Sequence, residues 1–254
     1  MIYITGDCHS DFRRFTTENF PEQKEMTKDD VVIIAGDFGG IWYQEDSSLI
    51  KDENHWLDWL EDKPFTTAFV DGNHEHHVRL NSYPVKEWHG GKVHEIRPSV
   101  LHLMRGEIFD ICDKKIFAFG GASSHDISDG ILDYEDEEWR FKARLLDLQG
   151  KHMYRIKGLS WWEEELPSQE EMQNGLDNLT KQNNKVDFIV THSPAASTVA
   201  LLGSGLYEQD ILTRYLEEIR CNTEYTRWFF GHFHIDQQIN AKDIGLYEQI
   251  IRIA

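Results

Sequence analysis

The feature that most constrains this chain is a motif that recurs where short apolar runs end. Six runs have the length and character of buried strands: Ile2–Thr5, Val31–Ala35, Thr67–Val70, Lys115–Phe119, Asp187–Val190 and Trp228–Phe230. Five of them lead into a small residue followed by carboxylate, amide or imidazole side chains: Gly6-Asp7-Cys8-His9, Gly36-Asp37-Phe38-Gly39-Gly40, Gly72-Asn73-His74-Glu75, Thr191-His192-Ser193-Pro194 and Gly231-His232-Phe233-His234. Because sites in α/β sheets form beyond the carboxyl ends of strands, we expect these side chains to converge.

The spacing and chemistry of these motifs indicate a metal site. Asp7 and His9 are two residues apart, as are His232 and His234. In extended backbone such pairs project to one face, and Cys8 points away. Carboxylate, imidazole and amide oxygen together suit Mn, Fe or Zn, and their number suits two ions that share a carboxylate. The seven candidate ligands are Asp7, His9, Asp37, Asn73, His192, His232 and His234.

Composition limits the binding partners and the cellular compartment that we expect. A formal net charge of -19 disfavours broad contact with nucleic acid, but a small phosphorylated substrate is compatible with it because bound dications dominate the local field. Three scattered cysteines without a CxxC pair argue against disulfides and a cysteine zinc site. No run has the length of a membrane span, and the N-terminus has no secretory pattern. We therefore expect a cytoplasmic protein with no membrane partner, and make no prediction of oligomeric state.

Strand-like runs that alternate with helical patterns predict an α/β fold. Helices are expected at Glu53–Leu60, Ser168–Gln182 and Asp210–Arg220, and antiparallel strands within Val100–Phe119. The second helix begins with Ser168 and Glu171, the spacing of a capping box. We expect residues 1–254 to form a single domain, with a possible lid or insertion at about 135–165.

Taken in order, the motifs resemble those of the calcineurin-like metallophosphoesterases: Asp-x-His, Gly-Asp-x-x-Gly, Gly-Asn-His-Glu, a lone His after a strand, and Gly-His-x-His. Each motif alone is a weak signal, but all five in order from Gly6 to His234 are specific. The resemblance implies a four-layer sandwich of two mixed β-sheets flanked by helices, with the metal site at the carboxyl ends of the strands.

The resemblance also implies the chemistry. It assigns Asp7, His9 and His234 to one ion, Asn73, His192 and His232 to a second, and Asp37 to both. A hydroxide held between the ions would attack phosphorus. His74 would contact the phosphate and protonate the leaving group. The implied function is two-metal-dependent hydrolysis of a phosphomonoester or phosphodiester, of a small molecule or nucleotide.

One position departs from a branch of that family. Serine/threonine protein phosphatases carry a second Asp that orients the histidine equivalent to His74, and Gly40 occupies its place here. The departure disfavours the protein-phosphatase branch and weakens the general-acid role of His74. Glu75, as the next residue, is expected to point elsewhere.

Two rival functions remain, a catalytically silent protein-binding scaffold of the same fold and a nuclease. The complete ligand set disfavours the first, and the acidic charge disfavours the second. His76 and His77 are interpreted as surface histidines, and His55, His89, His94, His102 and His152 as structural or solvated. The loop that contains Ser123 and Asp126 either reaches the site or is a plain strand end. Packing is favoured over base stacking for Trp161 and Trp162, and a plain loop over a phosphate cradle for Gly203-Ser204-Gly205.

Overall fold

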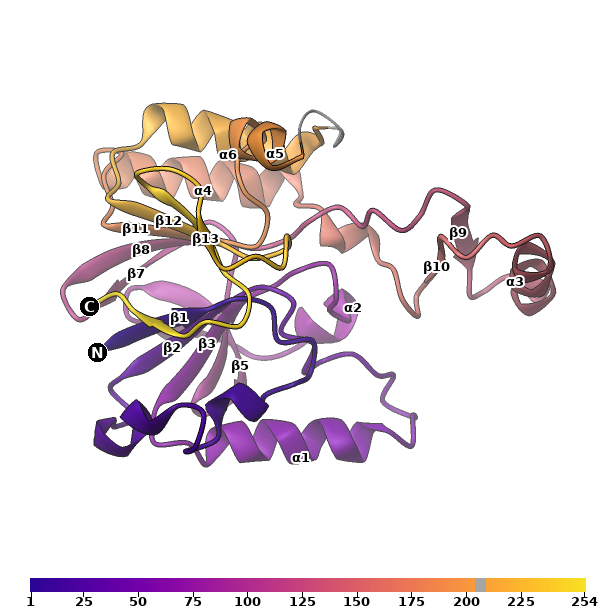
Figure 1. Ribbon diagram of the computed structural model, residues 1–254, viewed down its shortest axis with the longest axis horizontal. Helices are drawn as coiled ribbons and strands as arrows, with labels where there is room; N and C mark the ends of the chain where they lie inside the picture. Colours follow the sequence, from indigo (N-terminus) through magenta and orange to yellow (C-terminus); the bar gives the residue numbers. More distant parts are fainter. Residues whose placement is uncertain (204–208) are drawn as a thin grey trace.

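Strands that are buried on both faces build the centre of the molecule. Every residue of β1 (Ile2–Thr5), β2 (Val31–Ala35) and β3 (Thr66–Val70) is buried. A sheet with both faces buried needs a further layer on each side. The computed structural model, which describes residues 1–203 and 209–254, has this arrangement as a four-layer sandwich of two sheets between helices (Figure 1).

The first sheet has the strand order β15-β1-β2-β3-β6-β5-β4. Its other strands are β4 (Val85–Trp88), β5 (Gly91–Arg97), β6 (Val100–Leu103) and β15 (Ile251–Arg252). The adjacent strands β1, β2, β3 and β6 are parallel to one another, whereas β15, β5 and β4 run antiparallel to their neighbours. The ends of β1, β2 and β3 that carry the ligand motifs therefore lie at one edge.

The second sheet has the order β13-β14-β12-β11-β8-β7. Its strands are β7 (Glu107–Ile111), β8 (Lys114–Phe119), β11 (Phe188–Thr191), β12 (Arg227–Phe230), β13 (Gln237–Gln238) and β14 (Asp243–Gly245). The four central strands are parallel, and β7 and β13 are antiparallel to their neighbours. The antiparallel pairing expected within Val100–Phe119 is confirmed by β7 and β8.

Alternating side chains fill three apolar layers. Ile2 and Ile4 of β1 face the second sheet, whereas Tyr3 faces an outer layer that includes α1 (Ile50–Glu61). The opposite outer layer lies between the second sheet and α4 (Gln169–Lys181) and α6 (Ile211–Asn222). Shorter elements are α2 (His77–Leu80), α5 (Ala196–Leu202) and the 3-10 helices Arg13–Phe15, Pro21–Glu25 and Glu163–Glu165.

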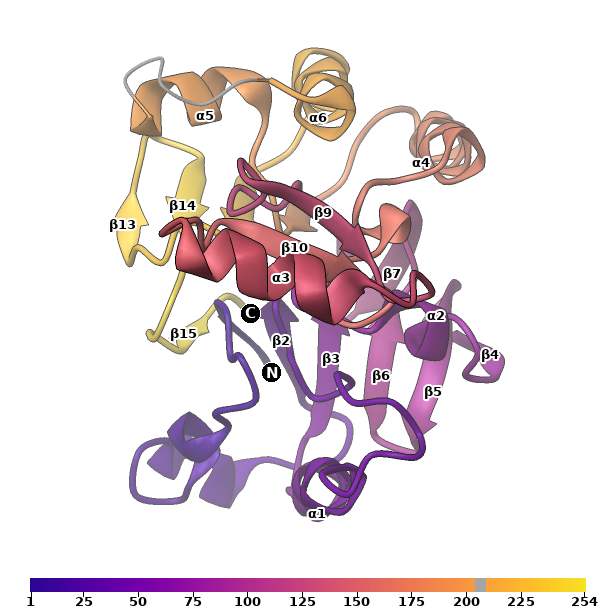
Figure 2. The ribbon, with the colours of Figure 1, turned by 90° about the vertical axis from the view of Figure 1, so that its right-hand side faces the viewer.

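Residues 130–157 form a unit that we call the arm. It consists of β9 (Gly130–Asp133), α3 (Trp139–Leu148) and β10 (Tyr154–Lys157), and the two strands pair in parallel. Figures 1 and 2 show the arm projecting from the end of the sandwich. It overlaps the segment that the sequence marks as a possible lid or insertion.

The expected elements agree closely with the observed ones. Each predicted strand matches an observed strand to within one residue at either end, and the capping box of Ser168 and Glu171 opens α4. Residues 204 and 205 of the predicted loop lie outside the described residues. No helix in the described part of the chain is both long enough and apolar enough to cross a lipid bilayer.

Candidate metal centre

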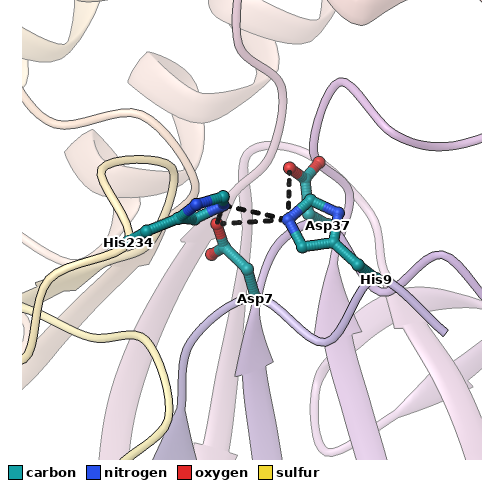
Figure 3. Close-up of side chains that lie close together, drawn as sticks. All are labelled: Asp7, His9, Asp37 and His234. Carbon is teal, nitrogen blue, oxygen red and sulfur yellow. Dashed lines mark hydrogen bonds and ion pairs between the residues drawn. The ribbon is translucent and has the colours of Figure 1, made fainter. Parts of the chain in front are cut away.

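Four predicted ligands gather where β1 and β2 end (Figure 3). One potential ligand atom from each of Asp7, His9, Asp37 and His234 lies within 4.8 Å of the others. His234 Nε2 is 3.1 Å from Asp7 Oδ2 and 2.9 Å from His9 Nε2. His9 Nε2 is 3.7 Å from Asp37 Oδ2. Carboxylate oxygens and imidazole nitrogens this close together suit a transition-metal ion.

Of the remaining candidates, His192 approaches the other oxygen of the Asp37 carboxylate and His232 lies beside His192. His192 Nε2 is 3.4 Å from Asp37 Oδ1, and the rings of His192 and His232 are 4.9 Å apart. Asn73 Oδ1 and His192 Nε2 are buried and have no hydrogen-bond partner among the described residues. Buried polar atoms are rarely left unpaired. These two lone pairs therefore fit a bound cation, and Asp37 has one oxygen near each group of ligands.

Hydrogen bonds orient the buried ligands. His192 Nδ1 lies 3.0 Å from the carbonyl oxygen of Ala35, so a proton on Nδ1 leaves Nε2 free to bind metal. The amide nitrogen of Asn73 donates to Ser124 Oγ at 3.3 Å, which leaves the amide oxygen free. Both contacts present the electron-pair donor, rather than an N–H group, to the centre.

The backbone at the ligands differs from the extended form assumed for the two-residue spacing. His9, Asp37, His232 and His234 have φ of 47°, 42°, 66° and 50°, in the left-handed region. The reason given for the convergence of Asp7 with His9, and of His232 with His234, is therefore wrong. The backbone turns sharply at each of these residues, just after the strand that precedes it, and the turns bring the side chains together. Backbone strain of this kind is concentrated at functional sites.

Glycines next to the ligands allow the loops to approach one another. A Cβ at Gly72 would lie 2.0 Å from Asp37 Oδ1, and one at Gly231 would lie 2.1 Å from Asp7 Oδ1. Any side chain at either position would displace a carboxylate. The small residues in the motifs thus make room for the neighbouring ligand, as well as for the turn.

Histidines offset the negative charge of the buried aspartates in the centre. Burial acts to raise the pKa of Asp37, but His192, His74 and His9 outweigh it and hold this pKa well below its usual range. Burial acts to lower the pKa of His192, and Asp37 and Asp7 overcome it and raise the value to about 10. Because metal ligands must be deprotonated, a cation that binds here displaces the His192 proton.

His74 lies beside the centre and is held from both ends. Its backbone N–H donates to Asp37 Oδ1 at 2.8 Å, and its Nε2 is 3.1 Å from Arg155 Nη2 of the arm. The Trp42 ring stacks on the imidazole at 5.8 Å. Burial lowers the pKa of His74 to about 4, against the opposing effect of Asp37 and reinforced by Arg155. The sequence did not reveal the contact with Arg155.

Glu75 braces the turn that carries Asp37. Its Oε1 accepts hydrogen bonds from the backbone N–H groups of Phe38 at 2.7 Å and Gly39 at 3.4 Å. The Glu75 side chain is thus directed at the loop after β2, where it orients the turn of Asp37. Neighbouring positions in the sequence do not reveal this contact.

His76 and His77 are buried, with 4% and 2% of their surface exposed, and the prediction of surface histidines is wrong. Trp162 packs over the His76 ring at 4.7 Å, and His77 Nδ1 lies 3.9 Å from Asp71 Oδ2. Trp162 is itself buried, which agrees with the packing role preferred for it. Trp161 Nε1 donates to Glu165 at 2.9 Å.

The loop after β8 reaches the centre, one of the two alternatives left by the sequence. Ser124 contacts Asn73, and Asp126 accepts a hydrogen bond from Arg155 at 2.6 Å. Ser123, Ser124 and His125 line a cavity of about 880 Å³ together with His232 and His234. This cavity offers a substrate access to the ligands.

The C-terminal segment returns to the centre and supports His234. The ring of Tyr247 stacks on the His234 imidazole at 4.6 Å. Its backbone N–H donates to Asp236 Oδ1 at 2.8 Å, and Arg14 donates to its carbonyl oxygen. His234 is the most exposed residue of the cluster in Figure 3, with 48% of its side chain accessible. Its position is therefore restricted by the stacked Tyr247 ring rather than by burial.

Comparison with known proteins agrees with the resemblance. The family model described as calcineurin-like phosphoesterase matches residues 1–236. A search of curated proteins gave no match. The matched segment covers nearly the whole chain and contains all seven candidate ligands. The order of the motifs, the two-sheet sandwich and the family match lead to one conclusion: the chain belongs to the calcineurin-like phosphoesterase family.

Proposed function

We propose that this protein hydrolyses phosphomonoesters or phosphodiesters of a small molecule or nucleotide with two bound divalent metal ions. The observation that carries the proposal is the position of Asp37. Its Oδ2 faces His9 and its Oδ1 faces His192, so one carboxylate lies between two groups of ligands. Its φ of 42° places it on a strained turn.

The donor set supports two ions of Mn, Fe or Zn. Asp7, His9 and His234 would hold one, Asn73, His192 and His232 the other, and Asp37 both. When bound, the ions would supply positive charge to the phosphoryl oxygens and lower the pKa of an attacking water. Asn73 Oδ1 and His192 Nε2, both buried and without a hydrogen-bond partner in the part of the chain that the structure describes, are the observation that most favours a cation here.

The surroundings support a small substrate. The cavity beside His232 and His234 has a volume of about 880 Å³ and a mixed lining of polar side chains, chiefly serine and histidine, with Asp210 and the apolar Ile127, Val199 and Phe233. Cavities of this size hold ligands from metabolites to nucleotides. A net charge of -19 opposes an extended polyanion, which disfavours a nuclease. The retention of every ligand disfavours a silent scaffold.

The function is tested with purified protein in the presence of Mn. Wild-type protein is expected to bind about two metal equivalents and to hydrolyse an aryl phosphate or a bis-aryl phosphate. Asp37→Asn is expected to lose at least about a thousandfold in kcat/KM, equivalent to about 4 kcal/mol, because it removes the shared carboxylate charge.

Asp110→Asn provides the matched control. Asp110 is 57% exposed and lies 3.8 Å from Lys115 on the surface, away from the ligands. The control should keep wild-type turnover and metal content. Full activity in Asp37→Asn would refute the mechanism, and absence of both metal and turnover in the wild type would favour the scaffold.

A further inference from the structure

Arg155 brings a positive charge from the arm to the metal centre. It lies in β10 and is buried, with 6% of its surface exposed. Its Nη2 is 3.1 Å from His74 Nε2, although 81 positions separate the two residues in the sequence. Arg155 belongs to none of the five ligand motifs.

The guanidinium is held in a fixed orientation. Its Nε donates to Asp126 Oδ1 at 2.6 Å, and its Nη1 donates to the carbonyl oxygen of Ser160 at 3.1 Å. The contact with His74 uses Nη2. Burial of a cation is costly, and Asp126 is 39% exposed at its side chain, so this ion pair offsets only part of the cost. A buried guanidinium in this position is suited to binding an additional anion.

Among the residues that the structure describes, Arg155 is the only hydrogen-bond partner of the His74 ring. The serine/threonine protein phosphatases carry an Asp at the motif position of Gly40, and a Cβ at Gly40 would lie 2.3 Å from Cε1 of the Phe38 ring. Phe38 is fully buried and stacks on Phe69 at 4.1 Å, so it has no room to move aside. The pocket therefore excludes an acidic side chain from residue 40.

The direction of the contact follows from the chemistry of arginine. The guanidinium has donors and no acceptor, so Nη2 of Arg155 donates and Nε2 of His74 accepts. The contact therefore places the positive charge of Arg155 beside His74.

We propose that Arg155 binds a phosphoryl oxygen of the substrate, so that the arm completes the active site. This inference rests on the proposed function. A phosphoryl oxygen carries negative charge, so a hydrogen bond from Arg155 to it joins two opposite charges, which the contact with an imidazole nitrogen does not. Arginine suits this role because its charge does not titrate and its donors are held in a plane.

The test compares Arg155→Ala with Arg140→Ala, both loaded with Mn. Arg140 lies on the same arm and stacks on Trp139, so its removal changes the net charge equally. Two quantities are measured: KM for an aryl phosphate, and the dissociation constant of inorganic phosphate by isothermal titration calorimetry. Arg155→Ala is expected to raise both by about 10- to 100-fold, with a smaller change in kcat, because a hydrogen bond to a charged group is lost.

Two further variants separate substrate binding from support of the fold. Arg155→Lys keeps the charge and is expected to recover part of the phosphate affinity. Asp126→Asn keeps Arg155 but weakens its anchor, and should raise KM by less than Arg155→Ala does. Metal content of each variant should match the wild type, and a melting temperature well above the assay temperature shows that each variant is folded.

Equal KM and equal phosphate affinity in Arg155→Ala and Arg140→Ala would overturn the inference. Failure of the proposed function is a separate result, since it would show as no turnover by the wild type. In that case the phosphate titration still decides the role of Arg155.

Discussion

Two buried aspartates follow neighbouring strands of the first sheet, Asp37 after β2 and Asp71 after β3. Burial acts to raise the pKa of each, and nearby cationic groups outweigh it and lower the value. Asp71 is paired within the protein: Arg105 donates to it from Nε at 3.1 Å and from Nη2, and His102 Nε2 lies 3.0 Å from it. In the described part of the chain, the carboxylate oxygens of Asp37 contact the rings of His9 and His192 and the backbone N–H of His74.

The difference shows how one residue type can serve two purposes. At Asp71 the cation is an arginine of the chain itself, and His94 extends the network through a 2.9 Å contact with His102. At Asp37 the neighbouring atoms Asn73 Oδ1 and His192 Nε2 have no hydrogen-bond partner within residues 1–203 and 209–254. The counter-charge at Asp71 thus comes from an arginine of the chain, whereas the donor atoms around Asp37 suit a cation from solution.

Asp71→Asn should have the largest effect on stability. It leaves the buried Arg105 guanidinium with only its longer ion pair, to Glu171 at 3.5 Å, so we expect a loss of about 3 kcal/mol in the free energy of unfolding. Urea denaturation of the metal-free protein measures it. Asp110→Asn on the surface should change stability by about 0.5 kcal/mol or less. A loss below about 1 kcal/mol at Asp71 would mean that the two clusters do not differ as described.

Stabilisation of the fold by bound metal should depend on Asp37 rather than on Asp71. One ion at 100 times its dissociation constant stabilises the folded state by about 2.7 kcal/mol. We expect Mn to raise the unfolding free energy of the wild type by this amount or more, and Asp37→Asn to lose most of the gain. Urea denaturation with and without chelator gives both values. Equal stabilisation of Asp37→Asn and wild type would show that Asp37 does not bind the ions.

Glu75 lies between the two clusters and should have the smallest effect. Burial, then Asp37 and Asp71, raise its pKa well above 4.5. A raised folded-state pKa contributes stability that is complete below the unfolded pKa and is lost as pH rises toward the folded pKa. Glu75→Gln has no such titration and keeps an acceptor oxygen. It should gain about 1 kcal/mol on the wild type between about pH 5 and pH 8 without metal.

The control for this pH dependence is Glu75→Ala. This substitution removes the acceptor for the backbone N–H groups of Phe38 and Gly39. The variant should therefore be less stable than the wild type both at about pH 5 and at about pH 8. A Glu75→Gln variant whose difference from wild type does not change with pH would contradict the raised pKa.

Local patterns predicted most of the fold. Runs such as Val31–Ala35 and the capping box at Ser168 act over a few residues, so the sequence displays them directly. The order of the ligand motifs also predicted which side chains would gather. The left-handed backbone at His9 and His234 was not predicted, because neither residue type requires it.

Contacts between distant segments account for what the sequence did not reveal. Arg105 lies 34 positions from Asp71, and Arg155 lies 81 from His74. Each arginine sits in a segment whose pattern indicates only a strand or a turn. Which carboxylate or imidazole it meets depends on how the strands and the arm pack. The burial of His77 follows from the same Asp71 cluster.

The support that Tyr247 gives His234 has a consequence for shortened recombinant forms. The family match ends at residue 236, and a fragment cut there would retain every candidate ligand. It would lack β14, which pairs with β12 next to the Gly231 motif, and the ring stacked on the His234 imidazole. Such a fragment would carry a full set of donors on a loosened loop. A conserved-domain boundary is therefore a poor guide to where this protein can be trimmed.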